Sequence, residues 1–491
     1  MTEEKAPQQQ QQQEQQQEER PQQPQPYRRK DLLQYPFVKK AILSRNLQPL
    51  AQLINFALFT FVIATGFIGI SLGAKNLAVV FTWILWSVLL ALVLTPLMGR
   101  SWCFMCPVVW PGEIIQRKLW RRFGTSSLGN RRWPRVLQNV WLQDFIFLTF
   151  ASWMVVLVTQ PFVTAVAVIL LMFVAVVTFS LFPRRQFCRR LCPMGSFIGL
   201  YSSFSPVEVR VKDRDTCLIP PEKGGCHKEC YVGSEKGYGC PWYEFPQNMV
   251  SDVDCGLCTE CFKTCPLDNI ALNVRPFEVE LESEQVKRKP DEAWRSMILL
   301  ALPIVYTAVL FGPWSWIKNW GDLLLYNSSV GLTQHIFYVL LVADVVLGLL
   351  PGLHYLASLG AKFLAEPKGV SARTLFVNYA YAYIPLGLML WVGFNFSLIM
   401  MEWSYIPVVA SDPLGAGWNL LGTTHLSWMP FALPIPIAEI AFALLGVFFS
   451  LKVGYTTLRR MFPDKMQAIM ALIPFAVLTA TLAIIFLWFY V

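Results

Sequence analysis

Long apolar stretches alternate with shorter polar ones along most of this chain, and the alternation predicts its architecture. Each apolar stretch is close to the roughly 20 residues that a helix needs to cross a bilayer. Nine of them are present, at about residues 53–73, 77–98, 143–160, 162–182, 296–313, 332–356, 374–400, 432–452 and 467–490. We therefore expect a mainly α, polytopic helical membrane protein with about nine spans. The sixth stretch is long enough to break near Pro351 and Gly352.

Two polar regions complete the expected domain plan. Residues 1–28 are almost entirely Gln, Glu and Pro, a composition that cannot bury a core, so we expect a disordered tail. Residues 205–280 hold most of the cysteines and lie between the fourth and fifth spans. The plan is a tail and basic flank over 1–48, a four-span membrane module over 49–204, an inserted α+β domain over 205–280 and a five-span module over 281–491.

Basic residues are concentrated in alternate loops. Apart from those before the first span, they follow the second, fourth, sixth and eighth spans, and they include Arg117, Lys118, Arg121, Arg122, Arg184, Arg185, Arg189, Arg190, Lys362, Lys368, Arg373, Lys452, Arg459, Arg460 and Lys465. The intervening loops, including 402–431, have almost no Lys or Arg. By the positive-inside rule, the N-terminus and the 205–280 domain are cytoplasmic and Val491 is outside.

The overall composition agrees with a membrane protein. Hydrophobic residues make up 54% of the chain and charged residues only 15%, whereas about a quarter of a soluble domain is charged. A net charge of +9 could indicate a nucleic-acid partner. Because the excess lies between the spans, orientation in the bilayer explains it better, and we expect no nucleic-acid binding.

One cysteine run in the inserted domain carries specific chemistry. Residues 255–266 read CGLCTECFKTCP, which is C-x2-C-x2-C-x3-C-P, the bacterial ferredoxin pattern for [4Fe–4S] clusters. So short a loop can aim its first three thiolates at one cluster. In two-cluster ferredoxins the fourth cysteine, here Cys265, ligates the other cluster, so the run predicts a second one.

A looser run upstream supplies the remaining ligands. Cys217, Cys226, Cys230 and Cys240 are spaced as C-x8-C-x3-C-x9-C-P, which looks like a first ferredoxin run lengthened by insertions. The crossing rule then predicts one cluster held by Cys240, Cys255, Cys258 and Cys261. It predicts a second cluster held by Cys217, Cys226, Cys230 and Cys265.

Two other roles are open to these eight cysteines. Pairs two residues apart also suit a structural zinc site, although the third cysteine in phase and the final Cys-Pro favour iron–sulfur clusters. Disulfides are less favoured, because a cytoplasmic domain keeps its thiols reduced.

The other four cysteines form two pairs at the cytoplasmic edge of the membrane. Cys103 and Cys106 lie in WCFMCP after the second span, and Cys188 and Cys192 lie in FCRRLCP after the fourth. Short turns join spans one to two and three to four, so the two hairpins can bring all four thiols together. A third cluster, a copper site and a dithiol are the candidate roles, and buried thiols without a ligand are the alternative. The adjacent arginines are expected to lower the thiol pKa values.

These motifs carry a resemblance over about residues 50–280. Four spans with Cys-Pro motifs after the second and fourth, followed by a ferredoxin domain, resemble the NapH/NosR/CcoG group of membrane-bound 4Fe-4S polyferredoxins. That group includes quinol dehydrogenase components, an electron donor to nitrous oxide reductase and a copper accessory protein. The resemblance implies electron transfer between a quinone/quinol pool or a cytoplasmic donor and a membrane or periplasmic redox partner. Here the Cys103–Pro107 motif is one residue shorter than the group's pattern, and spans five to nine have no counterpart in its short members.

Few residues in the C-terminal spans can carry chemistry. Asp344 and Glu439 lie within spans six and eight, where an ionisable group is costly and indicates either a proton site or an interhelical hydrogen bond. His335 and His354 lie at opposite ends of one span and cannot share an iron, so we do not expect haem.

Three functions fit this sequence. The leading hypothesis is a membrane electron-transfer protein, an oxidoreductase component with two cytoplasmic [4Fe–4S] clusters that exchange electrons with a quinone. The second is a cluster-dependent reductase or assembly factor that handles copper at the edge cysteines. The third is a redox sensor without turnover.

Overall fold

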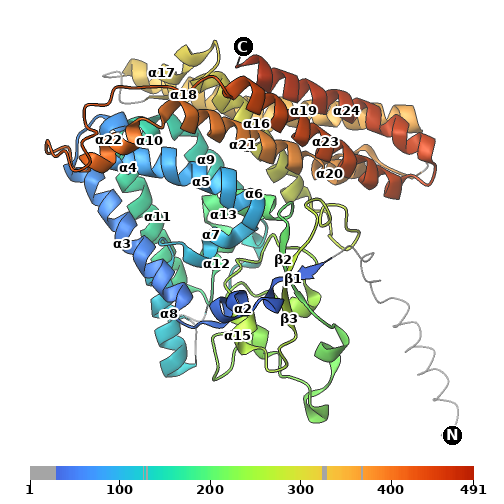
Figure 1. The fold of residues 1–491 in the computed structure, drawn as a ribbon. Coiled ribbons are helices and arrows are strands. Elements are labelled where there is room, and N and C mark those ends of the chain that lie inside the picture. Colours follow the sequence, from blue (N-terminus) through green and yellow to red (C-terminus); the bar gives the residue numbers. More distant parts are fainter. Residues whose placement is uncertain (1–28, 125–126, 129–130, 323–328, 367–368, 491) are drawn as a thin grey trace, which may run out of the picture.

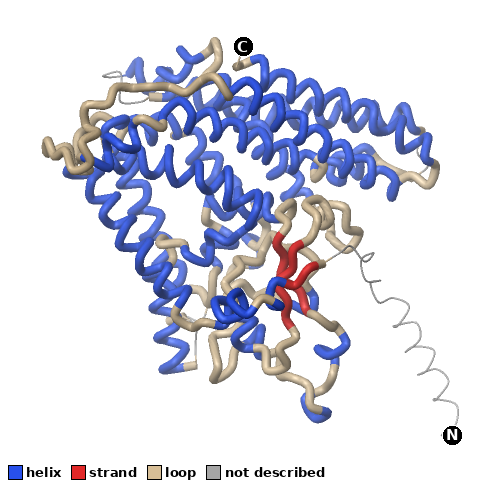
Figure 2. The backbone as a smooth tube through the Cα atoms, viewed as in Figure 1, coloured by secondary structure: helices blue, strands red, loops and turns tan. Residues whose placement is uncertain are grey.

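The computed structural model of this chain describes residues 29–124, 127–128, 131–322, 329–366 and 369–490. The predicted tail 1–28 and the terminal Val491 lie outside the described residues. Helices make up most of the rest, and the few strands gather in one small domain, shown in red in Figure 2. The protein is therefore mainly α, with a small α+β domain, as its sequence predicts.

Eight helices are long and apolar enough to cross a membrane among the residues described. They are Leu47–Ile68, Leu77–Met105, Pro161–Leu181, Pro290–Leu310, Gly331–Ala365, Tyr383–Glu402, Ile435–Met461 and Lys465–Trp488. Eight of the nine predicted spans are thus present as long helices. Large apolar side chains such as Phe363 and Ile437 remain on the surface of these helices, as lipid contact requires.

The span predicted at 143–160 differs from the others. It consists of two shorter helices, α9 (Trp141–Ser152) and α10 (Met154–Thr159), which meet at Trp153. The Ser152 hydroxyl donates to the Leu148 carbonyl oxygen and the Thr149 hydroxyl donates to that of Phe145. Trp153, with φ −94° and ψ 7°, is the non-helical residue at which the two helices join.

The N-terminal membrane module consists of two hairpins. The first pairs α3 (Leu47–Ile68) with the helical segment Leu77–Met105. In that segment π-helical turns separate α4 (Leu77–Val79), α5 (Ser87–Leu89) and α6 (Thr95–Met98), and a 3-10 turn at Gly99–Ser101 separates α6 from α7 (Trp102–Met105). The second pairs α9 and α10 with α11 (Pro161–Leu181). Three further helices continue from the cysteine ends of these hairpins: α8 (Trp110–Phe123), α12 (Gln186–Arg190) and α13 (Pro193–Ser202). Because α11 packs on both α3 and α8, the two hairpins hold their cysteine ends together.

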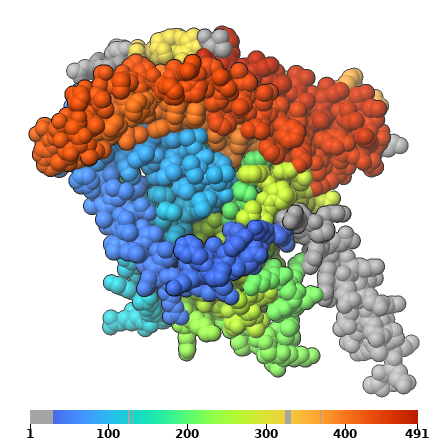
Figure 3. Space-filling model, viewed as in Figure 1, coloured from blue at the N-terminus to red at the C-terminus, as the bar shows by residue number. Residues whose placement is uncertain are grey.

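The C-terminal module covers one end of the molecule. Its helices are α16 (Pro290–Leu310), α17 (Lys318–Gly321), α18 (Ser329–Ala343), α19 (Leu350–Ala365), α20 (Ala372–Ala380), α21 (Tyr383–Glu402), α22 (Tyr405–Ser411), α23 (Ile435–Met461) and α24 (Lys465–Trp488). Helix α21 packs between α16 and α23, and α24 packs on α19 and α23. Figures 1 and 3 show this module, coloured from yellow to red, opposite the small domain, which is mainly green. The sixth span does not break at Pro351, because a π-helical turn over Asp344–Leu349 precedes it and absorbs the change in bonding.

The small domain contains a three-stranded antiparallel sheet in the order β1-β3-β2. The strands are β1 (Lys30–Asp31), β2 (Val207–Val211) and β3 (Ile270–Val274), and two short helices accompany them, α14 (Glu229–Val232) and α15 (Glu260–Thr264). Val207 pairs with Val274 and Val211 with Ile270. The basic flank joins this domain through β1 and through α2 (Pro36–Leu43), which contacts α15. The sequence did not predict that contribution, because the flank is too short and too basic to show a pattern.

Candidate functional site

The thiols of Cys240, Cys255, Cys258 and Cys261, which we name the first thiol group, lie together. The pKa of the Cys261 thiol is raised well above its ordinary value, first by burial and then by the thiols of Cys258, Cys240 and Cys255. Burial and then the Cys240 thiol raise the pKa of Cys258 to about 12. Three of these residues come from the compact run and one from the looser run upstream, which is the set that the ferredoxin pattern predicts.

The second thiol group consists of Cys217, Cys226, Cys230 and Cys265. Burial, followed by the Cys265, Cys226 and Cys217 thiols, raises the pKa of Cys230 to about 12. Asn269 connects two members directly, since its backbone N–H donates to Cys265 Sγ at 3.4 Å and its side-chain amide donates to Cys217 Sγ at 3.3 Å. The Cys230 thiol also interacts with Cys240 and Cys261, so the two groups are neighbours.

The edge thiol group consists of Cys103, Cys106, Cys188 and Cys192. All four line one small apolar cavity of about 90 Å³. Burial raises the pKa of the Cys106 thiol to about 12, and the thiols of Cys192 and Cys103 add to the shift. The two Cys-Pro motifs, which lie far apart in sequence, therefore meet where the hairpins pack together.

The arginines beside Cys188 and Cys192 do not bring the thiol pKa values below their ordinary value, which the sequence had led us to expect. Burial raises the pKa of the Cys188 thiol well above its ordinary value, and Arg185 lowers it by less than burial raises it. Arg189 is directed elsewhere, because its guanidinium donates to Glu244 at 3.0 Å and Asp254 at 2.9 Å. Sequence spacing cannot weigh burial against charge, and here burial is the larger effect.

Arg185 connects the edge thiol group to the first thiol group. Its charge interacts with the thiols of Cys188, Cys103 and Cys258. Its guanidinium donates to the Cys103 carbonyl oxygen at 2.7 Å and lies 5.7 Å from the centre of the Trp242 ring. A buried cation and an aromatic ring thus lie between two sets of four thiols.

A buried ion network holds Arg185 in this position. The Glu113 carboxylate accepts hydrogen bonds from Arg185, from Arg117 at 2.9 Å and from Gln52 at 3.0 Å. Arg117 also donates to Glu260 of α15 at 3.0 Å. Burial alone would raise the pKa of Glu113, but Arg185 and Arg117 outweigh it and lower the pKa to about 2.

This lowered pKa predicts an acid-dependent loss of stability. The ionised Glu113 carboxylate stabilises the fold above its ordinary pKa of 4.5, and the contribution falls as the pH drops towards about 2. At neutral pH it amounts to about 3 kcal/mol. We expect Glu113→Gln to lower the free energy of unfolding by that amount at neutral pH and to flatten its dependence on pH in this window. Tryptophan fluorescence of the iron-free protein measures both, and the exposed Glu235→Gln is the control. Equal pH dependence in the Glu113→Gln protein and the native protein would contradict the assignment.

Gly256, inside the compact run, has a second structural requirement. A Cβ atom at this position would lie 2.2 Å from two atoms of the Trp242 indole, which is 1% exposed. We expect Gly256→Ala to cost about 1–3 kcal/mol through overpacking and to lower the iron content of the purified protein. Gly352→Ala is the matched control, because a Cβ there meets open space. Unchanged iron content in Gly256→Ala would show that this contact does not position the first thiol group.

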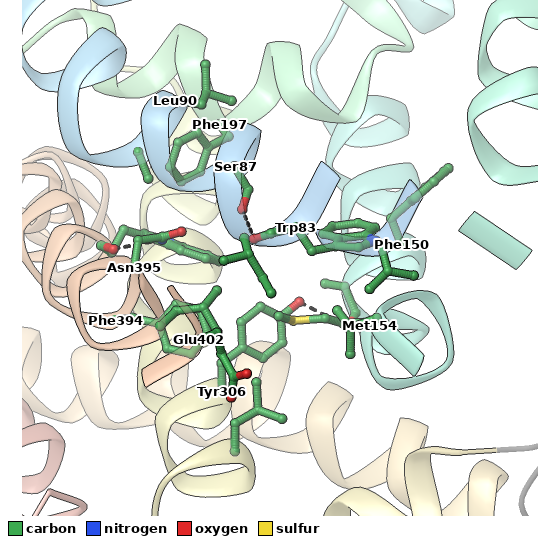
Figure 4. Close-up of a pocket in the computed structure, with 18 of the residues that line it drawn as sticks. Trp83, Ser87, Leu90, Phe150, Met154, Phe197, Tyr306, Phe394, Asn395 and Glu402 are labelled. Carbon is green, nitrogen blue, oxygen red and sulfur yellow. Dashed lines mark hydrogen bonds between the residues drawn. The ribbon is translucent and has the colours of Figure 1, made fainter. Parts of the chain in front are cut away.

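A larger apolar pocket adjoins the edge thiol group on the side away from the small domain. Its volume is about 360 Å³, and Figure 4 shows the aromatic and aliphatic side chains that surround it. Trp83, Phe150 and Met194 line both this pocket and the cavity of the edge thiols. Mostly apolar pockets of this size with a few polar groups are typical of small-molecule binding sites.

The acidic residues singled out from the C-terminal sequence do not line this pocket. Glu439 is fully buried, and its carboxylate accepts a hydrogen bond from the Ser397 hydroxyl at 2.6 Å, which joins α23 to α21. Asp344 is exposed on the surface of its helix. Of the two roles that the sequence indicated for Glu439, its contact with Ser397 is the interhelical hydrogen bond.

Both histidines of the sixth span contact the protein through ring nitrogens. His354 lies between the Tyr383 hydroxyl at 3.0 Å and the Phe376 carbonyl oxygen at 2.9 Å. His335 Nδ1 lies 3.0 Å from the Gly321 carbonyl oxygen.

The chemistry of the donor sets suits clusters. Among the described residues, no group of three or more His, Cys, Asp or Glu side chains has the geometry to hold one metal ion. A four-iron cubane lies between its ligands, so its cysteine sulfurs stand farther apart than the sulfurs around a single ion. Each of the three thiol groups supplies four cysteines from two stretches of sequence, which is the number of ligands that a [4Fe–4S] cluster takes.

Comparisons with known proteins agree with iron–sulfur chemistry. The model of the 4Fe-4S binding domain family matches residues 79–126 and 164–212. Those segments contain the four edge cysteines and end before Cys217. The sequence did not predict that the family match would fall on the edge cysteines rather than on the ferredoxin run.

Two curated relatives share part of the chain. YccM of Escherichia coli (strain K12), whose name describes an electron transport protein, is 28% identical over 130 residues, which are 26% of this chain and 32% of YccM. The methylamine utilization ferredoxin-type protein MauN of Paracoccus denitrificans (strain Pd 1222) is 40% identical over 63 residues, 12% of this chain and 21% of MauN. The chain thus spans about a third and about a fifth of these relatives. No solved structure matches this chain.

Proposed function

We propose that this chain is an inner-membrane electron-transfer protein that carries electrons between a cytoplasmic donor or acceptor and a quinone in the bilayer. Its starting point is that the chain carries a 4Fe-4S binding domain and apolar helices long enough to cross a membrane. The first and second thiol groups each hold one [4Fe–4S] cluster, and the edge thiol group holds a third.

The observation that carries this proposal is the order of the sites. The second thiol group neighbours the first through Cys230 and Cys240, and Arg185 and Trp242 lie between the first group and the edge group. The edge group shares walls with the apolar pocket. Clusters at the three groups form a continuous route, and the pocket at its membrane end accommodates a quinone head group. When bound, the clusters supply one-electron chemistry, and the chain supplies the cysteine ligands, the burial and the charge around them.

Basic residues on the side of the small domain support a cytoplasmic location for it. Lys452, in the C-terminal part of α23, forms an ion pair with Glu278, and Arg460, in the last turn of that helix, lies 3.5 Å from Glu284. The basic C-terminal part of α23 therefore lies beside the cluster domain, which the positive-inside rule assigns to the cytoplasm.

An iron and sulfide count tests the cluster content. We expect about twelve irons and a similar amount of acid-labile sulfide in anaerobically purified protein, with interacting EPR signals after reduction by dithionite. About eight irons would contradict the third cluster, and absence of acid-labile sulfide would contradict the whole proposal. Copper measured on the same sample tests whether the edge thiol group takes that metal instead.

A kinetic experiment tests the quinone step. Clusters reduced with stoichiometric dithionite are mixed with a short-chain quinone, and we expect their visible absorbance to recover with a rate that saturates as the quinone concentration rises. Failure of the quinone to reoxidise the clusters would contradict the quinone as partner and leave the cluster count unaffected.

A further inference from the structure

We infer that the pocket exchanges protons with the side of the membrane opposite the cluster domain, and that the carboxyl group of Glu402 is the group that exchanges them. The inference rests on the proposed quinone chemistry and adds to it a catalytic residue and a direction of proton movement. It follows from the two ends of the pocket, from its polar lining and from the surroundings of Glu402.

The two ends of the pocket differ in what they adjoin. Met194 lines its near end, two residues after Cys192, and belongs to the wall shared with the edge thiols. Its far end is lined by Ala74, in the turn between α3 and α4, and by Val158, near the end of α10. Glu402 is the last residue of α21 and belongs to the same end. The pocket therefore runs from the edge thiols towards the opposite membrane surface.

Glu402 is the one carboxylate among the described residues that line the pocket, and Lys318 is the one amine. Figure 4 shows Glu402 among the side chains around the cavity. The Lys318 side chain is exposed and interacts electrostatically with Glu402. Glu402 is half-buried, so its carboxyl group belongs both to the pocket and to the outer end of the helix bundle. A carboxyl group in this position can reach a pocket ligand and water.

The other polar side chains around the cavity donate their hydrogens within the protein. The Tyr306 hydroxyl donates to the Ala151 carbonyl oxygen at 3.0 Å, and the Asn395 amide donates to that of Trp391 at 2.9 Å. None of these groups titrates in the range where quinone chemistry exchanges protons with water. Lys318 also carries protons, but its side chain is exposed, whereas Glu402 is half-buried at the pocket wall. Glu402 is thus the lining residue placed for general acid–base catalysis.

The reaction balances with these groups alone. A quinone becomes a quinol by gaining two electrons and two protons. In each one-electron half of the reaction, a cluster held by Cys103, Cys106, Cys188 and Cys192 would supply one electron, and the quinone would gain it. One O–H bond of the Glu402 carboxyl group breaks, an O–H bond forms on a quinone oxygen, and Glu402 regains its proton from water at the far end. Quinol oxidation reverses each step. Because electrons enter from the cluster side and protons from the other side, the reaction moves charge across the membrane.

Substitution at Glu402 tests the inference in the full, cluster-loaded protein. We expect Glu402→Gln to slow reoxidation of the reduced clusters by a short-chain quinone about 100-fold, with the dependence on quinone concentration unchanged. Glu402→Asp retains a titratable group, so we expect it to recover most of the rate. Glu366→Gln, at an exposed carboxylate that ends α19, is the matched control, and the iron content of each variant shows whether its clusters are intact.

The pH profile and the side of proton uptake separate a catalytic role from a structural one. In the native protein the rate falls as Glu402 loses its proton with rising pH, and this fall is absent in Glu402→Gln. In vesicles with the cluster domain outside, a trapped pH indicator reports proton uptake from the interior. A Glu402→Gln rate and pH profile equal to those of the native protein, or proton uptake from the cluster side, would overturn the inference and leave the proposed function standing. A native protein that quinone cannot reoxidise would overturn both.

Discussion

Replacing Cys103, Cys106, Cys188 and Cys192 together by serine is expected to remove about four of about twelve irons and to abolish rapid reoxidation of the remaining clusters by quinone. The first effect follows because these thiols line one cavity and supply every cysteine in it. The second follows because this cavity shares walls with the pocket and lies beside Arg185, on the route from the first thiol group. Iron and sulfide analysis, EPR and the quinone mixing experiment measure the two effects on the same preparation.

The matched control is serine at the four positions of the second thiol group, Cys217, Cys226, Cys230 and Cys265. It is expected to remove about the same amount of iron. The reaction of the other two clusters with quinone is expected to stay unchanged. The two variants thus differ in function rather than in iron content. If the edge variant keeps its full iron content, these four thiols hold no cluster, and the route from the small domain ends at the first thiol group.

The grouping of the thiols in the small domain was predictable because it depends on local spacing. In the compact run, Cys255, Cys258 and Cys261 lie within one loop, and the displaced Cys265 requires a second set. The meeting of Cys103 and Cys188 was also predictable, because the short turns of the two hairpins place both motifs on one membrane face. Their roles as ligands remain predictions that the iron count tests.

Other features depend on contacts that spacing does not encode. The break at Trp153 falls inside a uniformly apolar stretch, where the hydrophobic pattern gives no sign of it. The high thiol pKa of Cys188 results from burial that outweighs the adjacent arginine. Glu402 did not stand out in the sequence, because it lies at the end of a span and becomes notable only where the pocket reaches it.

Filling the pocket is expected to separate quinone chemistry from cluster binding. Ala151 lines the pocket from α9 and is 6% exposed. The indole of Ala151→Trp has room in a cavity of about 360 Å³, so the usual cost of overpacking is reduced, and the ring occupies the volume that a quinone head group needs. We expect the iron content to stay unchanged and the rate of cluster reoxidation by quinone to fall at least tenfold, a loss of about 1.4 kcal/mol in transition-state stabilisation.

Ala57→Trp is the control for this substitution. Ala57 is exposed on α3, so the variant carries the same indole ring outside the pocket. Rates are compared over a series of quinone concentrations. A blocked pocket lowers the rate at every concentration, whereas reaction of quinone at the exposed cluster domain is unaffected by either variant. An Ala151→Trp protein that reacts like Ala57→Trp would therefore place the quinone reaction at the surface of the small domain. That outcome would leave the edge thiol group without a role in electron exchange with the membrane. A selective loss in Ala151→Trp would make the wall of Trp83, Phe150 and Met194 the last barrier that electrons cross.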